Sequence, residues 1–262
     1  MTVLRVSDLT IGVAGAAERP LVSGVDFALE AGGAIGLTGE SGAGKSLTAC
    51  ALCGLLPEPV RVLEGQLEIL GRRVRTRDAR SFRHLRGRDI FMVFQSPAGA
   101  LNPTLRIGAQ VAEALWAVRG WRRDDADDEA LRLLESVGLG AELFRSYPHE
   151  LSGGQRQRVL LATAFALEPR IIIADEATSG LDEVARDQVI ELIERLRATR
   201  GTAVVMISHD LRVLADAVDE LLVLYDGRQV EAGPIARLLE QPAHRHTVEL
   251  VRALRALGEE TR

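Results

Sequence analysis

The residues with the clearest chemical pattern form one short glycine-rich stretch. Its order is Gly39-Glu40-Ser41-Gly42-Ala43-Gly44-Lys45-Ser46, which has the spacing G-x-x-x-x-G-K-[ST]. Glycines at these positions let the backbone curl so that successive N–H groups point at phosphate oxygens. Lys45 adds a positive charge, and Ser46 offers a hydroxyl to Mg²⁺. The spacing predicts an ATP or GTP site. A glycine-rich turn that only caps a helix is the competing interpretation.

Polar side chains also follow three apolar runs further along the chain. Gln95 ends Ile-Phe-Met-Val-Phe, Asp175 and Glu176 end Ile-Ile-Ile-Ala, and His209 ends Ala-Val-Val-Met-Ile-Ser. Acids at the carboxyl end of a parallel strand lie where open α/β sheets bind ligands. Asp175 can therefore hold Mg²⁺, and Glu176 can polarise a water molecule. Taken alone, Gln95 is better explained as a solvated strand end.

A second glycine-bearing segment is Leu151-Ser152-Gly153-Gly154-Gln155. Ser152 can cap the helix predicted over 156–167, and the glycines allow another molecule to approach the backbone closely. The segment is therefore a second potential anion site at a helix N-terminus, although the motif alone is weak. Asp182 is similarly placed to cap a helix that runs to Arg200.

The flanking pattern supplies the elements that must position these groups. An apolar run over 34–38 predicts a buried strand before the first glycine loop, and 47–56 predicts a helix after it. Short alternating runs over 3–29 predict antiparallel strands. From residue 96 the sequence pattern is helical, and helices are predicted over 107–117 and 124–137. The chain should therefore be an α/β protein with an inserted helical region, and a last helix is predicted from about Thr247 to Leu257.

Composition limits the function classes. The chain has 262 residues, 47% of them apolar, and a net charge of -5, which gives no general attraction to polyanions. Neither a leader segment nor an apolar run of membrane-spanning length is evident, so a soluble, cytoplasmic protein is expected. The basic cluster from Arg72 to Arg88 is interpreted as a solvated face. Cys50 and Cys53 are interpreted as core residues, since no second cysteine pair completes a zinc site.

These motifs occur in the order typical of the ATP-binding cassette (ABC) family, which the chain resembles over nearly its whole length. The Leu-Ser-Gly-Gly-Gln segment makes the resemblance specific, because other phosphate-loop ATPases lack it. The resemblance implies a P-loop NTPase core with a parallel sheet, an N-terminal antiparallel β subdomain and an inserted helical subdomain. One ABC ATPase domain would cover 1–262, with the core over 1–95 and 168–240, the helical subdomain over 96–167 and a C-terminal helix over 241–262.

The resemblance also implies roles for single residues. Glu176 becomes the general base, His209 a switch residue that bonds the γ-phosphate, and Gln95 a lid residue. Mg²⁺ would be held by Ser46, Gln95 and Asp175. In the head-to-tail dimer that the family implies, two ATP molecules are bound by Gly39, Glu40, Ser41, Gly42, Ala43, Gly44, Lys45, Ser46, Leu47, Ser152, Gly153, Gly154, Gln155 and Asp182. The Ser152–Gln155 segment would reach the ATP of the opposite subunit.

Three further segments narrow the resemblance to ATPase subunits of peptide and nickel importers. They are 96–103, 147–150 and 244–247. Within that group the chain resembles the nickel or metal-chelate branch most, through the sequence over 39–48, His246-Thr247 and the short tail. The implied partners are two integral membrane permease subunits, a second and different ABC ATPase subunit, and an extracytoplasmic substrate-binding protein, with no nucleic acid. The implied location is peripheral, on the cytoplasmic face of the bacterial inner membrane.

Two departures from the family pattern stand out. No aromatic residue occurs between Leu9 and Val22 to stack on adenine, the nearest candidates being Ile11 and Val13, and Ala177 follows Glu176 where proline is usual. Two other functions stay open. One is a soluble accessory ATPase of a cytoplasmic enzyme complex, such as one for phosphonate breakdown. The other, an ATPase of DNA repair or translation, is less favoured because there is no long coiled-coil insertion and no second phosphate loop.

Overall fold

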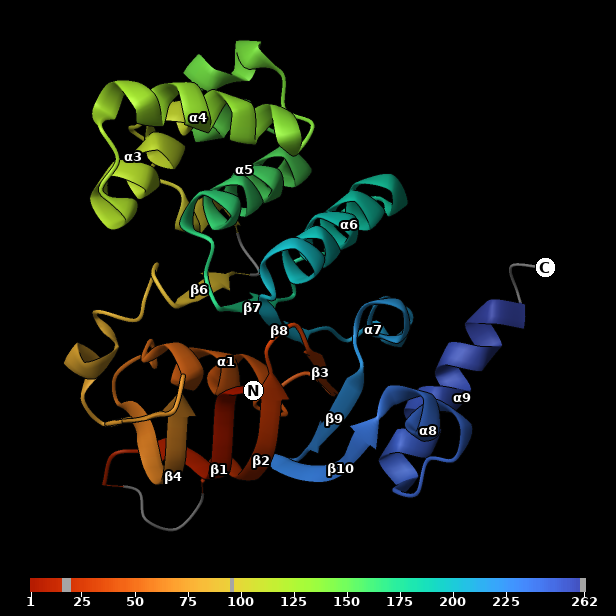
Figure 1. The fold of residues 1–262 in the computed structure, drawn as a ribbon. Coiled ribbons are helices and arrows are strands. Elements are labelled where there is room, and N and C mark those ends of the chain that lie inside the picture. Colours follow the sequence, from red (N-terminus) through yellow and green to blue (C-terminus); the bar gives the residue numbers. More distant parts are fainter. Residues whose placement is uncertain (16–19, 95–96, 260–262) are drawn as a thin grey trace. The chain divides into compact units, whose positions relative to one another are not determined.

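The computed structural model describes residues 1–15, 20–94 and 97–259 (Figure 1). Gln95 lies outside the described residues. Close contacts divide the chain into two compact units, which we call the first unit (Met1–Arg83 with Ala203–Arg262) and the second unit (His84–Thr202).

The first unit contains a mixed sheet with the strand order β5-β4-β1-β2-β10-β9-β3-β8. The chain pairs β1 antiparallel with both β2 and β4, as the alternating N-terminal runs predict, whereas β3 is parallel to β8 and β9. The strand bounds are β1 (Thr2–Val13), β2 (Val22–Glu30), β3 (Ala34–Gly39), β4 (Val60–Ile69), β5 (Arg72–Val74), β8 (Ala203–Ile207), β9 (Glu220–Tyr225) and β10 (Arg228–Pro234).

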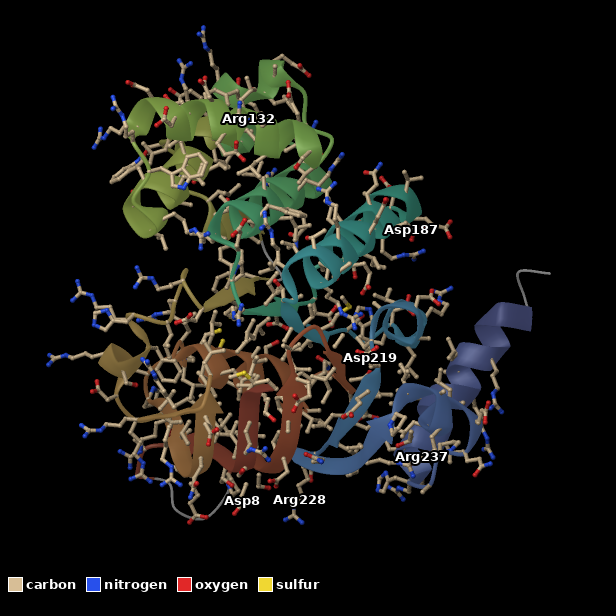
Figure 2. All side chains as sticks on the ribbon, viewed as in Figure 1. Asp8, Arg132, Asp187, Asp219, Arg228 and Arg237 are labelled. Atoms are coloured by element: carbon tan, nitrogen blue, oxygen red, sulfur yellow. The ribbon has the colours of Figure 1, made fainter. Side chains whose placement is uncertain are left out.

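All residues of β3 and all residues of β8 are buried, which explains why these strands lack alternation in the sequence. A side chain anchors the start of β3, because the Ala34 N–H donates to Asp219 Oδ2 at 2.7 Å (Figure 2). The next residue of the chain, Glu220, begins β9. The phosphate-loop strand is therefore fixed at its start before it reaches the glycines at its end.

The helices of the first unit are α1 (Lys45–Cys53), the 3-10 turn η1 (Ala79–Phe82), α7 (Leu211–Ala217), α8 (Ile235–Glu240) and α9 (Arg245–Glu259). Helix α1 is shorter than the predicted 47–56, because Gly54 adopts a left-handed conformation with φ 63° and ends it before the prolines. Cys53 is buried on this helix, as the core interpretation predicts, whereas Cys50 is only half-buried.

The second unit pairs β6 (Ile90–Val93) in parallel with β7 (Ile171–Asp175). Its helices are α2 (Pro97–Ala100), α3 (Ile107–Arg119), α4 (Arg123–Ser136), α5 (Gly153–Leu167) and α6 (Glu183–Arg200), with 3-10 turns η2 (Ala141–Arg145) and η3 (Pro148–Glu150). Helices α3, α4 and α5, green in Figure 1, pack on one another. No helix among the described residues is both long and apolar enough to cross a lipid bilayer.

Candidate nucleotide site

The glycine loop at the end of β3 has a backbone that only glycine can adopt. Gly39 has φ 144°, and a Cβ there would lie 2.0 Å from the Leu224 carbonyl oxygen of the neighbouring strand β9. Gly44 has φ 95°, and its Cβ would lie 2.3 Å from the Val22 side chain. Both positions therefore exclude a side chain by conformation and by contact.

The loop leads into α1 with its first-turn N–H groups directed outward. Gly44 is the N-cap, and no side chain of the described residues caps this helix. The N-terminus therefore offers N–H donors and the positive end of the helix dipole. Lys45 extends back over the loop, where its Nζ donates to the carbonyls of Gly39 at 2.8 Å and Glu40 at 2.9 Å. Ser46 is exposed.

His209 lies at the same edge of the sheet as the loop. Leu37 pairs with Ile207, and the Ser208 N–H donates to the Leu37 carbonyl at 3.2 Å. His209 itself is exposed, and the next residue, Asp210, accepts from the Arg212 N–H at 2.9 Å to cap α7. The first unit thus brings His209 and the Gly39–Ser46 loop together at the carboxyl ends of adjacent parallel strands.

A cavity of about 480 Å³ adjoins the same loop. It is lined by Gly42 of the loop together with Pro20, Leu21, Ser23, Asp226, Gly227 and Arg228. Leu21 is 41% exposed, which is high for a large apolar side chain. This cavity was not predicted from the sequence, because its walls come from segments about 200 residues apart.

In the second unit, Asp175 ends β7 and Glu176 follows it, and both are buried, with 5% and 9% of their surface exposed. Glu176 has a left-handed backbone with φ 50°, and its carbonyl accepts from the Ser179 N–H at 3.0 Å. Non-glycine residues rarely adopt this conformation, and where they do they cluster at functional sites. The turn was not predicted from the sequence.

The second glycine segment is closed by its own side chains. The Ser152 N–H donates to Gln155 Oε1 at 2.9 Å, and the Gln155 N–H donates to Ser152 Oγ at 3.2 Å, which forms a reciprocal capping box. Helix α5 consequently begins at Gly153 rather than at the predicted Arg156. Asp182 caps α6 as predicted, accepting from the Ala185 N–H at 2.8 Å.

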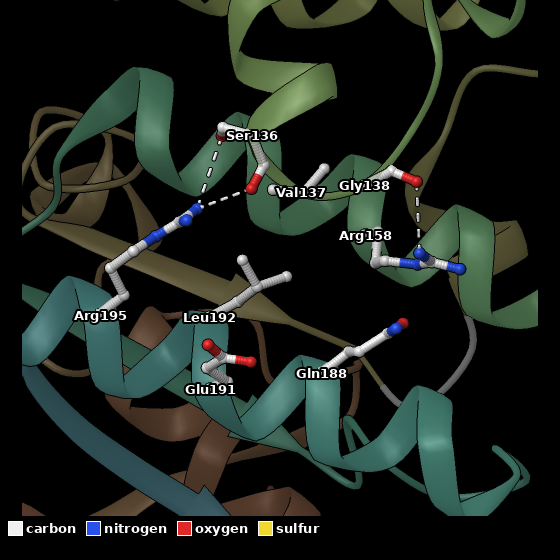
Figure 3. Close-up of a pocket in the computed structure, with 8 residues that line it drawn as sticks. All are labelled: Ser136, Val137, Gly138, Arg158, Gln188, Glu191, Leu192 and Arg195. Carbon is white, nitrogen blue, oxygen red and sulfur yellow. Dashed lines mark hydrogen bonds between the residues drawn. The ribbon is translucent and has the colours of Figure 1, made fainter.

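The second unit has a cavity of its own, of about 200 Å³, which lies between α4, α5 and α6 (Figure 3). Arg195 donates there to the Ser136 carbonyl at 3.0 Å, and Arg158 donates to the Gly138 carbonyl at 3.4 Å. None of the residues predicted to bind nucleotide lines this cavity.

Two of the predicted metal ligands carry oxygen donors, which suit a hard divalent cation. Ser46 offers a hydroxyl in the first unit, and Asp175 offers a carboxylate in the second, both of which are oxygen ligands of the kind Mg²⁺ prefers. Within the described residues, no group of three or more histidine, cysteine, aspartate or glutamate side chains is arranged to hold a metal by itself.

Comparison with known proteins assigns the class. The model of a family described as "ABC transporter" matches residues 22–179, a span that contains the glycine loop, the Ser152–Gln155 segment and Glu176. The chain therefore belongs to the ABC transporter family. This result confirms the resemblance seen in the sequence.

Its relatives include ATP-binding proteins of peptide importers. The chain is 38% identical to the oligopeptide transport ATP-binding protein OppD of Salmonella typhimurium over 98% of this chain and 77% of the relative. It is 42% identical to the di/tripeptide transport ATP-binding protein DppF of Pseudomonas aeruginosa over 93% and 74%.

Among solved structures, a dimeric ATP-binding cassette in a post-hydrolysis state with ADP and Pi matches with a TM-score of 0.78. It is 27% identical and covers 88% of this chain and 98% of that chain. The predicted α/β fold is confirmed by this match.

Proposed function

We propose that this chain is the ATP-binding and ATP-hydrolysing subunit of an ABC importer. The observation that carries the proposal is the open N-terminus of α1, which follows two glycines that tolerate no side chain and has Lys45 folded across the loop. This arrangement supports recognition of a nucleotide's phosphates, and the relatives named above are ATP-binding proteins of importers.

In the proposed reaction, ATP transfers its γ-phosphoryl group to water. Such a reaction needs charge neutralisation and an oriented nucleophile more than covalent help. Lys45 and the N–H groups of α1 would bind the phosphates, and Glu176 would accept the proton of the attacking water. Bound Mg²⁺, held by Ser46 and Asp175, would supply positive charge to the phosphates. His209 would donate to the γ-phosphate, and the role of Gln95 stays a prediction.

We further propose that the cavity beside Gly42 holds the sugar and base of the nucleotide. Ile11, one of the two nearest candidates for stacking, has none of its surface exposed and is therefore unable to contact a base. The exposed apolar surface of Leu21 lies in the cavity wall and can cover one face of a purine. Contact with an aliphatic side chain is less specific than aromatic stacking, so weak discrimination between ATP and GTP is expected.

The exposed Ser152 and Gly153 are proposed to complete the ATP site of a second subunit. The dimeric cassette among the solved structures supports a dimer. We also propose that the second ATPase subunit is a different chain, and that two permeases and an extracytoplasmic binding protein complete the importer. The proposed location of the chain is peripheral, on the cytoplasmic face of the bacterial inner membrane. The division of the domain, with a helical subdomain over 96–167, is likewise proposed.

For the cargo, the relatives favour peptides. They are named for oligopeptides, for di- and tripeptides and, in an Escherichia coli relative 37% identical over 90% of this chain, for glutathione. The nickel or metal-chelate branch stays a prediction without a counterpart among these relatives. The permeases and the binding protein are expected to select the cargo.

Glu176→Gln tests the proposed reaction. The amide keeps the shape of the carboxylate but does not accept the water's proton, so ATP binding should persist. Turnover in the assembled importer should fall by about a thousandfold, the middle of the range for a general base. The matched control is Glu191→Gln, an exposed carboxylate on α6 that should leave turnover unchanged. Steady-state hydrolysis at the native rate by Glu176→Gln would exclude Glu176 as the base.

A further inference from the structure

A histidine that has no part in the proposed chemistry is buried beside the phosphate loop. His246, at the start of α9, has 3% of its surface exposed, and neither of its ring nitrogens has a hydrogen-bond partner among the described residues. A buried polar group without a partner lowers stability, so such groups are uncommon and usually have a function. His246 therefore requires an explanation.

The surroundings of His246 come from several segments of the first unit. Its Nδ1 lies 3.7 Å from Glu40 Oε1 of the loop and 3.9 Å from Glu249 Oε2 of its own helix. Its ring centre lies 4.6 Å from that of Tyr225, at the end of β9, and its backbone N–H donates to His244 Nδ1 at 3.3 Å. The packing fixes the ring, while Nδ1 remains directed at two carboxylates that lie just beyond hydrogen-bond distance.

Glu40 connects this histidine to the lysine that is proposed to bind phosphate. Its carbonyl accepts from Lys45 Nζ at 2.9 Å, and its carboxylate, on a residue with 62% of its side-chain surface exposed, faces His246. Tyr225, which packs on the histidine, directly follows Leu224, whose carbonyl lies against Gly39. His246 at the start of α9 and Gly39 at the start of the loop therefore contact two consecutive residues of the chain, Tyr225 and Leu224.

Binding of phosphates changes what the Glu40 peptide contacts. Lys45 Nζ now donates to the carbonyls of Gly39 and Glu40, and turning toward a phosphate would weaken the hydrogen bonds that hold this part of the loop. The Glu40 carboxylate would also repel the phosphates if it turned toward them. A hydrogen-bond donor on the side of Glu40 away from the phosphates would hold the carboxylate there. It would also give this part of the loop a contact that does not depend on Lys45.

We propose that His246 is a positioning residue for the phosphate loop, its Nδ1 holding the Glu40 carboxylate away from the phosphates while Lys45 moves to them. Through this contact the C-terminal helix α9 supports ATP binding without touching the nucleotide. The inference rests on the proposed function, because it requires that the loop bind ATP.

The test measures ATP affinity of the purified full-length chain by titration with a fluorescent ATP analogue, together with the melting temperature. His246→Phe keeps the ring that packs on Tyr225 but removes Nδ1. It should weaken ATP binding roughly threefold to tenfold, the range of one hydrogen bond. In a Glu40→Gln background, which lacks the negative charge to be held, the same substitution should have less than about half of that free-energy effect.

Two further variants separate positioning from packing. His246→Gln restores a side-chain N–H and should recover part of the affinity, and it serves as the test variant if His246→Phe does not fold. Glu249→Gln removes the carboxylate that is not part of the loop, so it should leave ATP affinity unchanged. Melting temperatures close to that of the native chain would show that the affinity changes are not caused by unfolding.

The outcomes distinguish the inference from the proposed function. If the native chain binds ATP and Lys45→Ala weakens that binding, the proposed function stands. If His246→Phe then has no effect, or the same effect with and without the Glu40 charge, the positioning role is wrong and His246 is a packing residue. If the native chain does not bind ATP, the proposed function fails, and the positioning role fails with it.

Discussion

The two glycine-bearing helix starts of this protein look alike in sequence but differ in structure. At α1, the N-terminus has no side-chain cap, and Gly39 and Gly44 have no room for a Cβ. At α5, Ser152 and Gln155 form a reciprocal capping box. A Cβ on Gly153 would meet nothing within 4 Å, and one on Gly154 would make only ordinary contacts, the nearest at 3.5 Å.

The difference concerns the source of the requirement for glycine. At α1 the chain's own backbone demands it, through conformation and through contact with β9 and β2. At α5 the described residues of the second unit leave room for a side chain at Gly153, and alanine is a better helix former than glycine. A glycine that costs stability without a local reason points to close approach by another molecule, which agrees with the proposed ATP of a second subunit.

Gly39→Ala should produce the largest effect of this comparison. The new Cβ would meet the Leu224 carbonyl at 2.0 Å in a backbone region reserved for glycine. Strain and overpacking of about 1–3 kcal/mol each should lower the melting temperature by roughly 10 °C and abolish ATP binding. The measurements are thermal unfolding and ATP titration.

The matched control is Gly36→Ala on the same strand. Its Cβ would lie 3.1–3.2 Å from the ends of three apolar side chains, which can move, and its backbone has no positive φ. We expect a smaller loss of stability and retained ATP binding. Equal effects of the two substitutions would contradict the view that the loop conformation, rather than general crowding, sets the requirement at Gly39.

Gly153→Ala should behave in the opposite way. The lone chain should keep its melting temperature and its ATP affinity, because the position is open and alanine is a good helix former. Turnover per subunit in the assembled importer should fall about tenfold or more, since a methyl group would enter the space proposed for the partner's ATP. The same assay should show that the native chain hydrolyses ATP slowly when alone and dilute, and faster when assembled.

Lower stability of Gly153→Ala with normal assembled turnover would place the requirement for glycine inside this chain. Equal turnover of the dilute native chain and the assembly would show instead that the ATP sites are not shared between subunits. The first result would contradict the proposed contact of Gly153 with the partner's ATP, and the second would contradict the proposed sharing of ATP sites.

Local signals predicted most of the elements, and long-range contacts account for what was missed. The apolar runs of β3, β7 and β8 and the glycine spacing are local patterns, so these strands and the loop were predicted. The end of helix α1 was predicted at Leu56, whereas the left-handed Gly54 ends the helix earlier.

The features that the sequence did not reveal depend on segments that meet only in the fold. His246 and Glu40 lie near opposite ends of the chain, so their contact has no local signature. Propensity rules do not predict the left-handed turn at Glu176, because they treat a non-glycine residue at positive φ as unfavourable. The roles of the site residues came from resemblance, and they stay predictions.

A third helix start, that of α9, is held by a carboxylate from another element, and it offers the smallest predicted effect. Glu231 on β10 accepts from the Ala243 N–H at 2.9 Å and from the His244 N–H at 3.0 Å, just before α9 begins. Burial alone would raise the pKa of Glu231, but these two N–H donors hold its pKa below the ordinary value of 4.5. Because the folded-state pKa is lowered, the stabilisation is present above pH 4.5 and is lost as the pH falls through the folded-state value.

Glu231→Gln should therefore reduce the free energy of unfolding by about 0.5–1 kcal/mol at pH 7, a modest loss because the carboxylate is partly exposed to solvent. The difference in the free energy of unfolding between native chain and variant, measured by urea unfolding, should narrow as the pH falls from 4.5 through the lower folded-state pKa of Glu231. Below that pKa both side chains are neutral. Glu249→Gln is the control, since no backbone N–H donates to its carboxylate among the interactions described, and it should leave the free energy of unfolding at pH 7 nearly unchanged. A native-to-variant gap for Glu231→Gln that stayed constant or widened in acid would show that the carboxylate charge does not hold the start of α9.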